Sequence, residues 1–286
     1  MTSALALLAT YLAVPAFLEL LQRGGAVRAN HQQQQVPVGG GFLFVWMGSL
    51  AAALAGQLGP GRQLATGPGA AGMPVILFTA AALGYSLLGL FDDLVGTRKQ
   101  TGLLGHGRAL LQGHLTSGAV KALAGGIFGF VLAVYRLPVK GLGAAPTEAG
   151  LFRSAVDGLL IAASANTLNL FDLRPGRAGK AFLAGWALML LGGSPVSTAL
   201  LPWVGSFLGY FSFDLRGEVM MGDAGSNSLG ALLGLAACYA LALPFRLVLL
   251  AFLILLHLLA ERISFSQVID NHWILHRLDS WGRREP

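Results

Sequence analysis

The chain has 286 residues, of which 55% are hydrophobic and only 11% charged, and its mean hydropathy is +0.66. These values exclude an ordinary soluble domain and indicate a polytopic membrane protein, because the apolar residues form runs long enough to cross a hydrocarbon layer of about 30 Å. The net charge of +6 does not indicate nucleic-acid binding, since the basic residues are dispersed between these runs.

Nine apolar runs predict an all-α bundle of about nine membrane-spanning helices. The expected ranges are 3–21, 41–58, 73–91, 116–135, 152–170, 181–193, 196–212, 226–243 and 245–260. The first run has no basic n-region and no cleavage site, so we expect it to stay as a span. The single Cys238 lies in an apolar run, which excludes an internal disulfide and favours a packing role.

Lysine and arginine residues are unequally divided between the two sides of these runs, fourteen against five. The positive-inside rule places the richer side in the cytoplasm, the N-terminus outside and the C-terminus inside. We expect a multi-pass protein of the plasma (inner) membrane, with residues 1–262 as its membrane domain. In residues 263–286, apolar side chains at helical spacing predict a cytoplasmic amphipathic helix on the inner leaflet.

Two polar segments on the predicted cytoplasmic side come early in the chain. NHQQQQVPVGGG, at 30–41, is either a flexible polar loop or a turn whose backbone approaches a substrate closely. In FDDLVG, Asp92 and Asp93 are adjacent at the mouth of the third run. A shared cation or proton relieves the repulsion between such carboxylates. Mg²⁺ suits this position because it binds through carboxylates and substrate phosphates, and a solvated loop end is the alternative.

The third polar segment is NTLNLFDLRPGRAGK, at 166–180. Asn166, Asn169 and Asp172 are each three residues apart, so on a helix end they project to one side and suit a hard metal or a polar substrate. The cations that follow carry donors suited to phosphate: Arg174, Arg177 and Lys180. The positive-inside rule explains these cations, but it does not explain the asparagines or the aspartate, which cost free energy near hydrocarbon.

The fourth polar segment is MMGDAGSNSLG, at 220–230, which enters the eighth run. Gly222 and Ser226 flank Asp223 at a predicted helix start. Free backbone N–H groups and the helix dipole there favour a phosphate, and Asp223 could hold a metal against it. The alternative is an Asp N-cap beside a packing glycine.

In their order and common side, these segments resemble motifs of the polyprenyl-phosphate N-acetylhexosamine-1-phosphate transferases. VPVGGG resembles the family's P-x-x-G-G, FDDLVG its DD motif, NTLNLFD its N-x-x-N-x-x-D, and MMGDAGSNSLG its F-M-G-D-x-G-S-x-x-L-G. GLLGHGRALLQ resembles a segment with a phosphate-binding lysine, and Arg108 stands at that position. The resemblance runs from about residue 10 to residue 260.

The resemblance implies transfer of an N-acetylhexosamine 1-phosphate from a UDP-sugar to polyprenyl (undecaprenyl) phosphate, releasing UMP, in cell-envelope glycan synthesis. It implies Mg²⁺ as the cofactor, with Mn²⁺ as the alternative. Asp92 and Asp93 would orient or deprotonate the lipid phosphate, and Asn169 and Asp223 would hold the metal. Asp172 would contact the nucleotide sugar or support the metal. The other residues expected to bind substrate are Asn166, Arg108, Arg174, Arg177, Lys180, Gly222 and Ser226.

The chain departs from the family pattern at several positions. Pro175 stands where the family has a second acid, and Met220 stands where an aromatic ring is expected to stack on uracil. His272 and His276 are the nearest match to a His-rich loop. The alternative function is therefore a relative that binds polyprenyl phosphate without transferring sugar, in carrier handling or regulation. A transporter is disfavoured because the polar residues gather at one surface, and a homodimer is left open.

Overall fold

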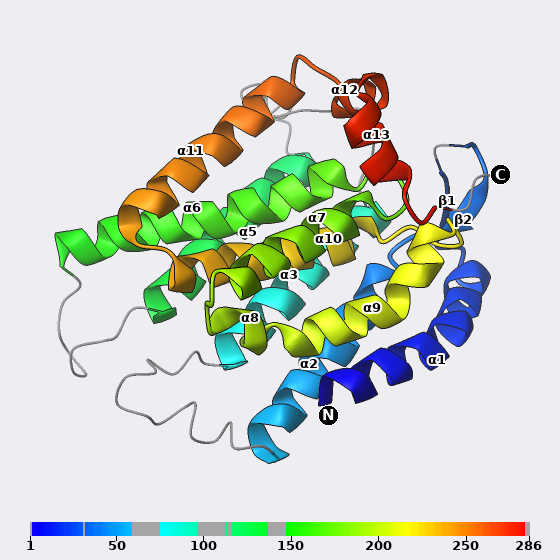
Figure 1. The fold of residues 1–286 in the computed structure, drawn as a ribbon, viewed down its shortest axis with the longest axis horizontal. Helices are drawn as coiled ribbons and strands as arrows, with labels where there is room; N and C mark the ends of the chain where they lie inside the picture. Colours follow the sequence, from blue (N-terminus) through cyan, green and yellow to red (C-terminus); the bar gives the residue numbers. More distant parts are fainter. Residues whose placement is uncertain are drawn as a thin grey trace.

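The computed structural model describes residues 2–30, 32–58, 75–95, 113, 116–136 and 147–283, and this part of the chain is almost entirely helical. Figure 1 shows the longer helices running alongside one another, with α10 inside the bundle. The described helices are α1 (Thr2–Arg23), α2 (Gly41–Leu58), α3 (Val75–Val95), α5 (Ser117–Arg136), α6 (Glu148–Phe171), α7 (Arg177–Leu191), α8 (Val196–Ala199), α9 (Leu201–Leu215), α10 (Gly222–Ala240), α11 (Leu243–Ala260), α12 (Phe265–Asn271) and α13 (Trp273–Ser280).

Four of these helices are long and apolar enough to cross a membrane, which supports the prediction of a membrane protein. They are α1, α3, α5 and α11, and α2 is a shorter apolar helix. Each of the nine predicted runs overlaps a helix, although the seventh is divided at Leu200 into α8 and α9. The other five predicted spans stay predictions.

α10 is the most enclosed of the described helices, and it packs mainly against α6 and α3. Small residues allow this close approach. A Cβ built on Gly89 of α3 would lie 2.2 Å from the carbonyl oxygen of Asp223, and one built on Gly41 of α2 would lie 2.3 Å from Cα of Gly225. Glycine at these two positions therefore lets the first turn of α10 contact the backbones of α2 and α3.

A two-stranded antiparallel hairpin precedes α2, where the sequence predicted a flexible loop or a turn near a substrate. Strands β1 (Val27–Ala29) and β2 (Gln35–Pro37) pair with Arg28 opposite Val36. The glycines after β2 contact the chain that enters α10, because the N–H of Gly40 donates to Met220 (3.1 Å) and the N–H of Gly41 donates to Met221 (2.9 Å). The hairpin is thereby tied to the start of α10.

A buried ion cluster joins α5, α6 and α11 at the end of these helices remote from the hairpin. The carboxylate of Asp157 is fully buried and accepts hydrogen bonds from Arg136 and from Arg246 (2.6 Å). Charged groups inside such a bundle are costly unless they are paired. The cluster therefore fixes the mutual positions of the three helices.

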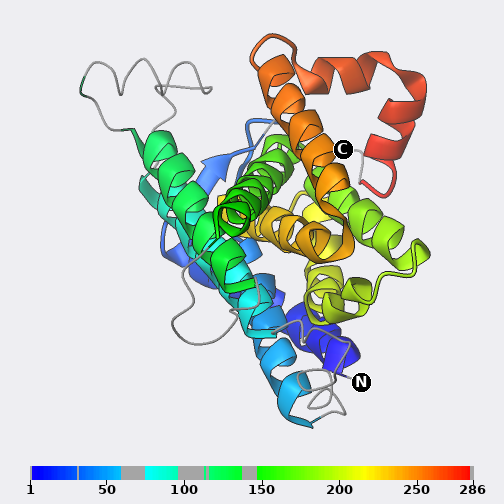
Figure 2. The ribbon, with the colours of Figure 1, turned by 90° about the vertical axis from the view of Figure 1, so that its left-hand side faces the viewer.

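The predicted single amphipathic helix at the C-terminus is wrong in one respect, because the chain breaks at His272. His272 adopts an extended conformation (φ −111°, ψ 110°) between α12 and α13. Figure 2 shows α11 leading into these two short helices, which fold back towards α7. We refer to Ser264–Arg283 as the C-terminal segment.

Candidate active site

The carboxylate of Asp93 caps the N-terminus of α10 from a different helix. It accepts hydrogen bonds from the backbone N–H groups of Asp223 and Ala224, both at 3.1 Å, and its side chain is buried. Arg28 of β1 donates to the main-chain carbonyl of Asp93. The N-cap residue of α10 is Met221, so the alternative of Asp223 as an N-cap is wrong. The two N–H groups expected to be free for a phosphate are occupied by Asp93.

Lys121 of α5 lies between the other two acids of the site. Its Nζ contacts the carboxylate of Asp223 and is 3.2 Å from Oδ2 of Asp92. The three side chains are only 17–22% exposed, so the ammonium charge is weakly screened by water. The structure thus relieves the repulsion in the DD pair by sending Asp92 to Lys121 and Asp93 to the helix terminus.

Sequence reasoning missed Lys121, which it counted only as a cytoplasmic cation. A signal for it exists, because a lysine inside an apolar run costs free energy unless it has a partner. Lys121 lies in the second turn of α5, whose other charged residue, Arg136, is at the helix end. The partners could not be identified from the sequence, since Asp92 and Asp223 are far from Lys121 along the chain.

Asn169, near the end of α6, lies between Asp223 and Ser226. Its Nδ2 donates to Oδ2 of Asp223 (3.2 Å), and the hydroxyl of Ser226 donates to its Oδ1 (3.2 Å). The Ser226 hydroxyl also lies 3.0 Å from the carbonyl oxygen of Gly222, which has φ +72°. A Cβ at Gly222 would lie 2.6 Å from Oδ2 of Asp93, so glycine is needed there. Asn166 lies half-buried one turn earlier on α6.

The acids of the site have the donor chemistry that a hard divalent ion needs. The described part of the chain contains no group of three or more His, Cys, Asp or Glu residues that could hold a metal. Asp92 and Asp223 nevertheless converge on one cation, the Lys121 ammonium, and the Asn169 amide is beside them. Carboxylate and amide oxygens are ligands that Mg²⁺ accepts.

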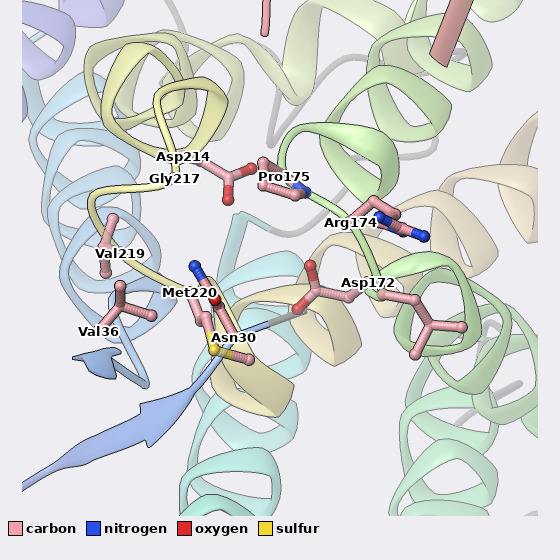
Figure 3. Close-up of a pocket in the computed structure, with 10 residues that line it drawn as sticks. Asn30, Val36, Asp172, Arg174, Pro175, Asp214, Gly217, Val219 and Met220 are labelled. Atoms are coloured by element: carbon pink, nitrogen blue, oxygen red, sulfur yellow. The ribbon is translucent and has the colours of Figure 1, made fainter. Parts of the chain in front are cut away.

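A pocket that opens to solvent adjoins these acids at the end of α6. Figure 3 shows the carboxyl groups of Asp172 and Asp214 directed into the space beside Met220. Burial, with the nearby charges of Asp214 and Asp223, raises the pKa of Asp172 well above its usual value. Sequence reasoning missed Asp214. The remaining lining residues are Asn30, Val36, Leu173, Arg174, Pro175, Gly217 and Val219.

The structure gives two of the predicted phosphate-binding cations a partner in the C-terminal segment and places a third beside the pocket. Arg177 and Lys180 donate to Asp279 of the C-terminal segment, while Arg174 lines the pocket. Arg108 lies outside the described residues. His276 is 58% exposed, and its Nδ1 is 3.7 Å from Oδ1 of Asp270.

No protein-family model matches the chain, and a search of curated proteins found no match. The site is therefore interpreted from its geometry and from the motifs themselves. Its two parts are adjacent, because Asp172 ends the helix that carries Asn169, and the N–H of Asp172 donates to the carbonyl oxygen of Asn169 (3.0 Å). One part gathers carboxylates around the Lys121 ammonium, and the other is a partly apolar pocket with two carboxyl groups.

Proposed function

We propose that the chain transfers an N-acetylhexosamine 1-phosphate from a UDP-sugar to polyprenyl phosphate, for example undecaprenyl phosphate, and releases UMP. The observation that carries this proposal is the convergence of Asp92 and Asp223 on one cation, with Asn169 beside them. These residues come from three of the motifs that resemble those of the phosphotransferases. Their meeting point lies beside a pocket in which the carboxyl groups of Asp172 and Asp214 converge next to apolar side chains (Figure 3).

The proposed reaction needs two phosphorylated substrates held close together. A phosphate oxygen of the lipid attacks the β-phosphorus of the donor, the bond from this phosphorus to the bridging oxygen breaks, and UMP leaves with that oxygen. Asp92, near the end of α3, orients the lipid phosphate. The ammonium group of Lys121 attracts the negative charge of this phosphate. Catalysis of phosphoryl transfer consists mostly of such positioning and charge stabilisation.

Asp223 and Asn169 are the residues that would hold Mg²⁺, or Mn²⁺ in its place. A bound divalent ion would neutralise the diphosphate of the donor. The role of Asp93 is different from that proposed by the resemblance, because its carboxylate holds the first turn of α10 and so positions Asp223. We therefore assign Asp93 as a positioning residue.

The pocket is proposed to receive the nucleotide part of the donor. Met220 and Val219 offer apolar contact to a base, while Asp172 and Asp214 accept hydrogen bonds from hydroxyl or N–H groups when ionised. Pro175 lines this pocket where the phosphotransferase pattern has an acid, which is the strongest reason to test several donors.

The test uses the full chain purified in nanodiscs with Mg²⁺, undecaprenyl phosphate and a panel of UDP-N-acetylhexosamines, with release of UMP as the readout. Asp223→Asn should abolish release. Glu218→Gln is the matched control, because Glu218 is exposed and pairs only with the neighbouring Arg216 in the described contacts (2.6 Å). If no donor yields UMP while the lipid phosphate still binds, the enzyme assignment is wrong and the non-catalytic alternative holds.

We further propose that this site faces the cytoplasm of a cell whose plasma membrane the chain spans. The unequal division of Lys and Arg supports this orientation. A reporter fused to the C-terminus, active only in the cytoplasm, should be active. A second reporter, which is active only outside the cell, should be inactive at the C-terminus. Activity of this second reporter would show that the orientation is the reverse of the one proposed.

A further inference from the structure

Arg177, at the start of α7, is held by the C-terminal segment. Its Nε and Nη2 donate to the two carboxylate oxygens of Asp279, both at 2.8 Å, and its Nη1 donates to the Ser266 hydroxyl at 2.8 Å. Both charged side chains are only 6% exposed. A bidentate, buried pair of this kind has a fixed geometry. The carboxylate also offsets the unfavourable position of a cation at a helix N-terminus.

Further contacts join the same two parts of the chain. Lys180 donates to the carbonyl oxygens of Leu278 (3.1 Å) and Asp279 (2.5 Å). Arg283 donates to the carbonyl oxygen of Pro175 (2.7 Å) and pairs with Asp279 (2.8 Å). The C-terminal segment therefore contacts both the first turn of α7 and the loop before it.

That loop, residues 173–176, forms one wall of the pocket. Leu173, Arg174 and Pro175 line the pocket, and the N–H of Gly176 donates to Oδ2 of Asp214 (3.0 Å) on its other side. The loop thus lies between Asp214 on α9 and the Asp279 pair of the C-terminal segment. Loss of either contact would free one side of the pocket wall.

The opposite face of α13 is exposed and carries four large apolar side chains around the exposed Arg277. The helical residues Trp273, Ile274 and Leu278 and the C-cap residue Trp281 lie on one side and are 70%, 45%, 61% and 77% exposed, respectively. Tryptophan is typical of the boundary between lipid and water. The matching partner is a lipid surface, because α11 is long and apolar enough to span the membrane and ends at Ala260, only a short turn before α12 begins at Phe265.

Exposed apolar residues follow one another along the chain from α11 into the C-terminal segment. Leu255, Leu258 and Ile263 are 53%, 56% and 45% exposed, and they lead towards Val268, which is 44% exposed. A helix that leaves the membrane beside the apolar face of the next one keeps that face at the same boundary. If the partner of this face were a second copy of the chain, the exposed apolar residues would not need to follow on from a membrane-spanning helix.

We propose that α13 lies in the interfacial zone of the bilayer through its Trp273, Ile274, Leu278 and Trp281 face, and that its other side holds the pocket wall through the Asp279–Arg177 pair. The membrane surface thereby becomes part of what shapes the pocket. Asp279 and Arg177 act as positioning residues, since neither lines the pocket in the described structure.

The first measurement tests the lipid contact in the full chain, reconstituted in phosphatidylcholine nanodiscs. Ile274→Cys carries a spin label, and the native Cys238 does not compete because it is buried. The label should be more accessible to oxygen than to a water-soluble nickel complex. Greater accessibility to nickel would overturn the proposal, and so would a label shielded from both reagents by dimerisation.

The second measurement tests the coupling by amide hydrogen exchange of residues 173–180. Asp279→Asn should accelerate exchange by about tenfold or more, as expected for the loss of a charge-assisted hydrogen bond, with exchange of α10 unchanged. Asp270→Asn is the matched control, because Asp270 is in the same segment but is 44% exposed and 3.8 Å from Arg174. Equal exchange in the two variants would overturn the coupling.

The third measurement joins the two parts of the proposal. Replacing both Trp273 and Trp281 with Ser weakens the lipid contact without touching Asp279, so exchange of residues 173–180 should rise severalfold in nanodiscs. In detergent micelles the double variant and the original chain should exchange more alike. Unchanged exchange in nanodiscs would show that the bilayer does not act on the pocket wall.

Discussion

Replacing Gly89 with Ala should displace the first turn of α10 from α3. The added Cβ would lie 2.2 Å from the carbonyl oxygen of Asp223 and 2.5 Å from the nitrogen of Ala224, where ordinary contacts begin at 3.4 Å. The obstructing atoms belong to the backbone, so no side chain can rotate away. Relief requires the two helices to separate by about 1 Å, which is typical of overpacked sites.

This separation acts directly on the proposed site. The two hydrogen bonds from α10 to Asp93 are 3.1 Å long, so an extra 1 Å takes them outside hydrogen-bonding distance. Overpacking costs about 1–3 kcal/mol, and the better helix propensity of Ala returns about 0.5–1 kcal/mol. The net cost, up to about 2.5 kcal/mol, should lower the Tm by up to about 10 °C. A misplacement of this size should also reduce UMP release by about a hundredfold.

The assay compares thermal unfolding and UMP release of Gly89→Ala with those of Gly126→Ala, in nanodiscs. Gly126 is a helical glycine of α5 with no atom within 4 Å of an added Cβ, so its variant should be as stable as the original chain or slightly more so. Full activity and an unchanged Tm in Gly89→Ala would refute the claim that this close approach positions Asp223.

Lys121→Met should lower UMP release by about a hundredfold or more, because it removes the only cation that contacts both carboxylates in the described site, whereas Lys121→Arg should retain part of the activity. Equal rates in all three proteins would exclude this role. Asp157→Asn should destabilise the chain by about 3–5 kcal/mol, seen in thermal unfolding, since two buried arginines lose their carboxylate. Burial raises the pKa of Asp279, but the hydrogen bonds and positive charges of Arg177 and Arg283 outweigh burial and leave the pKa below the usual 3.8. The ionised Asp279 should therefore stabilise the C-terminal segment fully above the pKa of an unfolded aspartate. This stabilisation should be lost as the pH falls through the lower pKa of Asp279 in the folded chain, as measured by amide hydrogen exchange of the C-terminal segment. The same pH profile in Asp279→Asn would contradict this.

Hydropathy and residue type were sufficient to predict the helical membrane character, since each apolar run must satisfy its own backbone within lipid. The resemblance to the phosphotransferase motifs implied that Asn169, Asp172, Asp223 and Ser226 belong to one site, which stays a prediction. Helical spacing carries this information for residues within a few turns, and an ordered set of motifs carries it between helices.

Only the tertiary structure decided which charge meets which. Asp92 and Asp93 are adjacent in sequence, yet Asp92 contacts Lys121 and Asp93 caps α10. Successive side chains of an α-helix point in different directions around its axis, so the two carboxylates face different helices. Arg177 looked like a phosphate ligand and instead binds Asp279. Such pairings depend on how distant helices pack, and no local pattern of residue types specifies that.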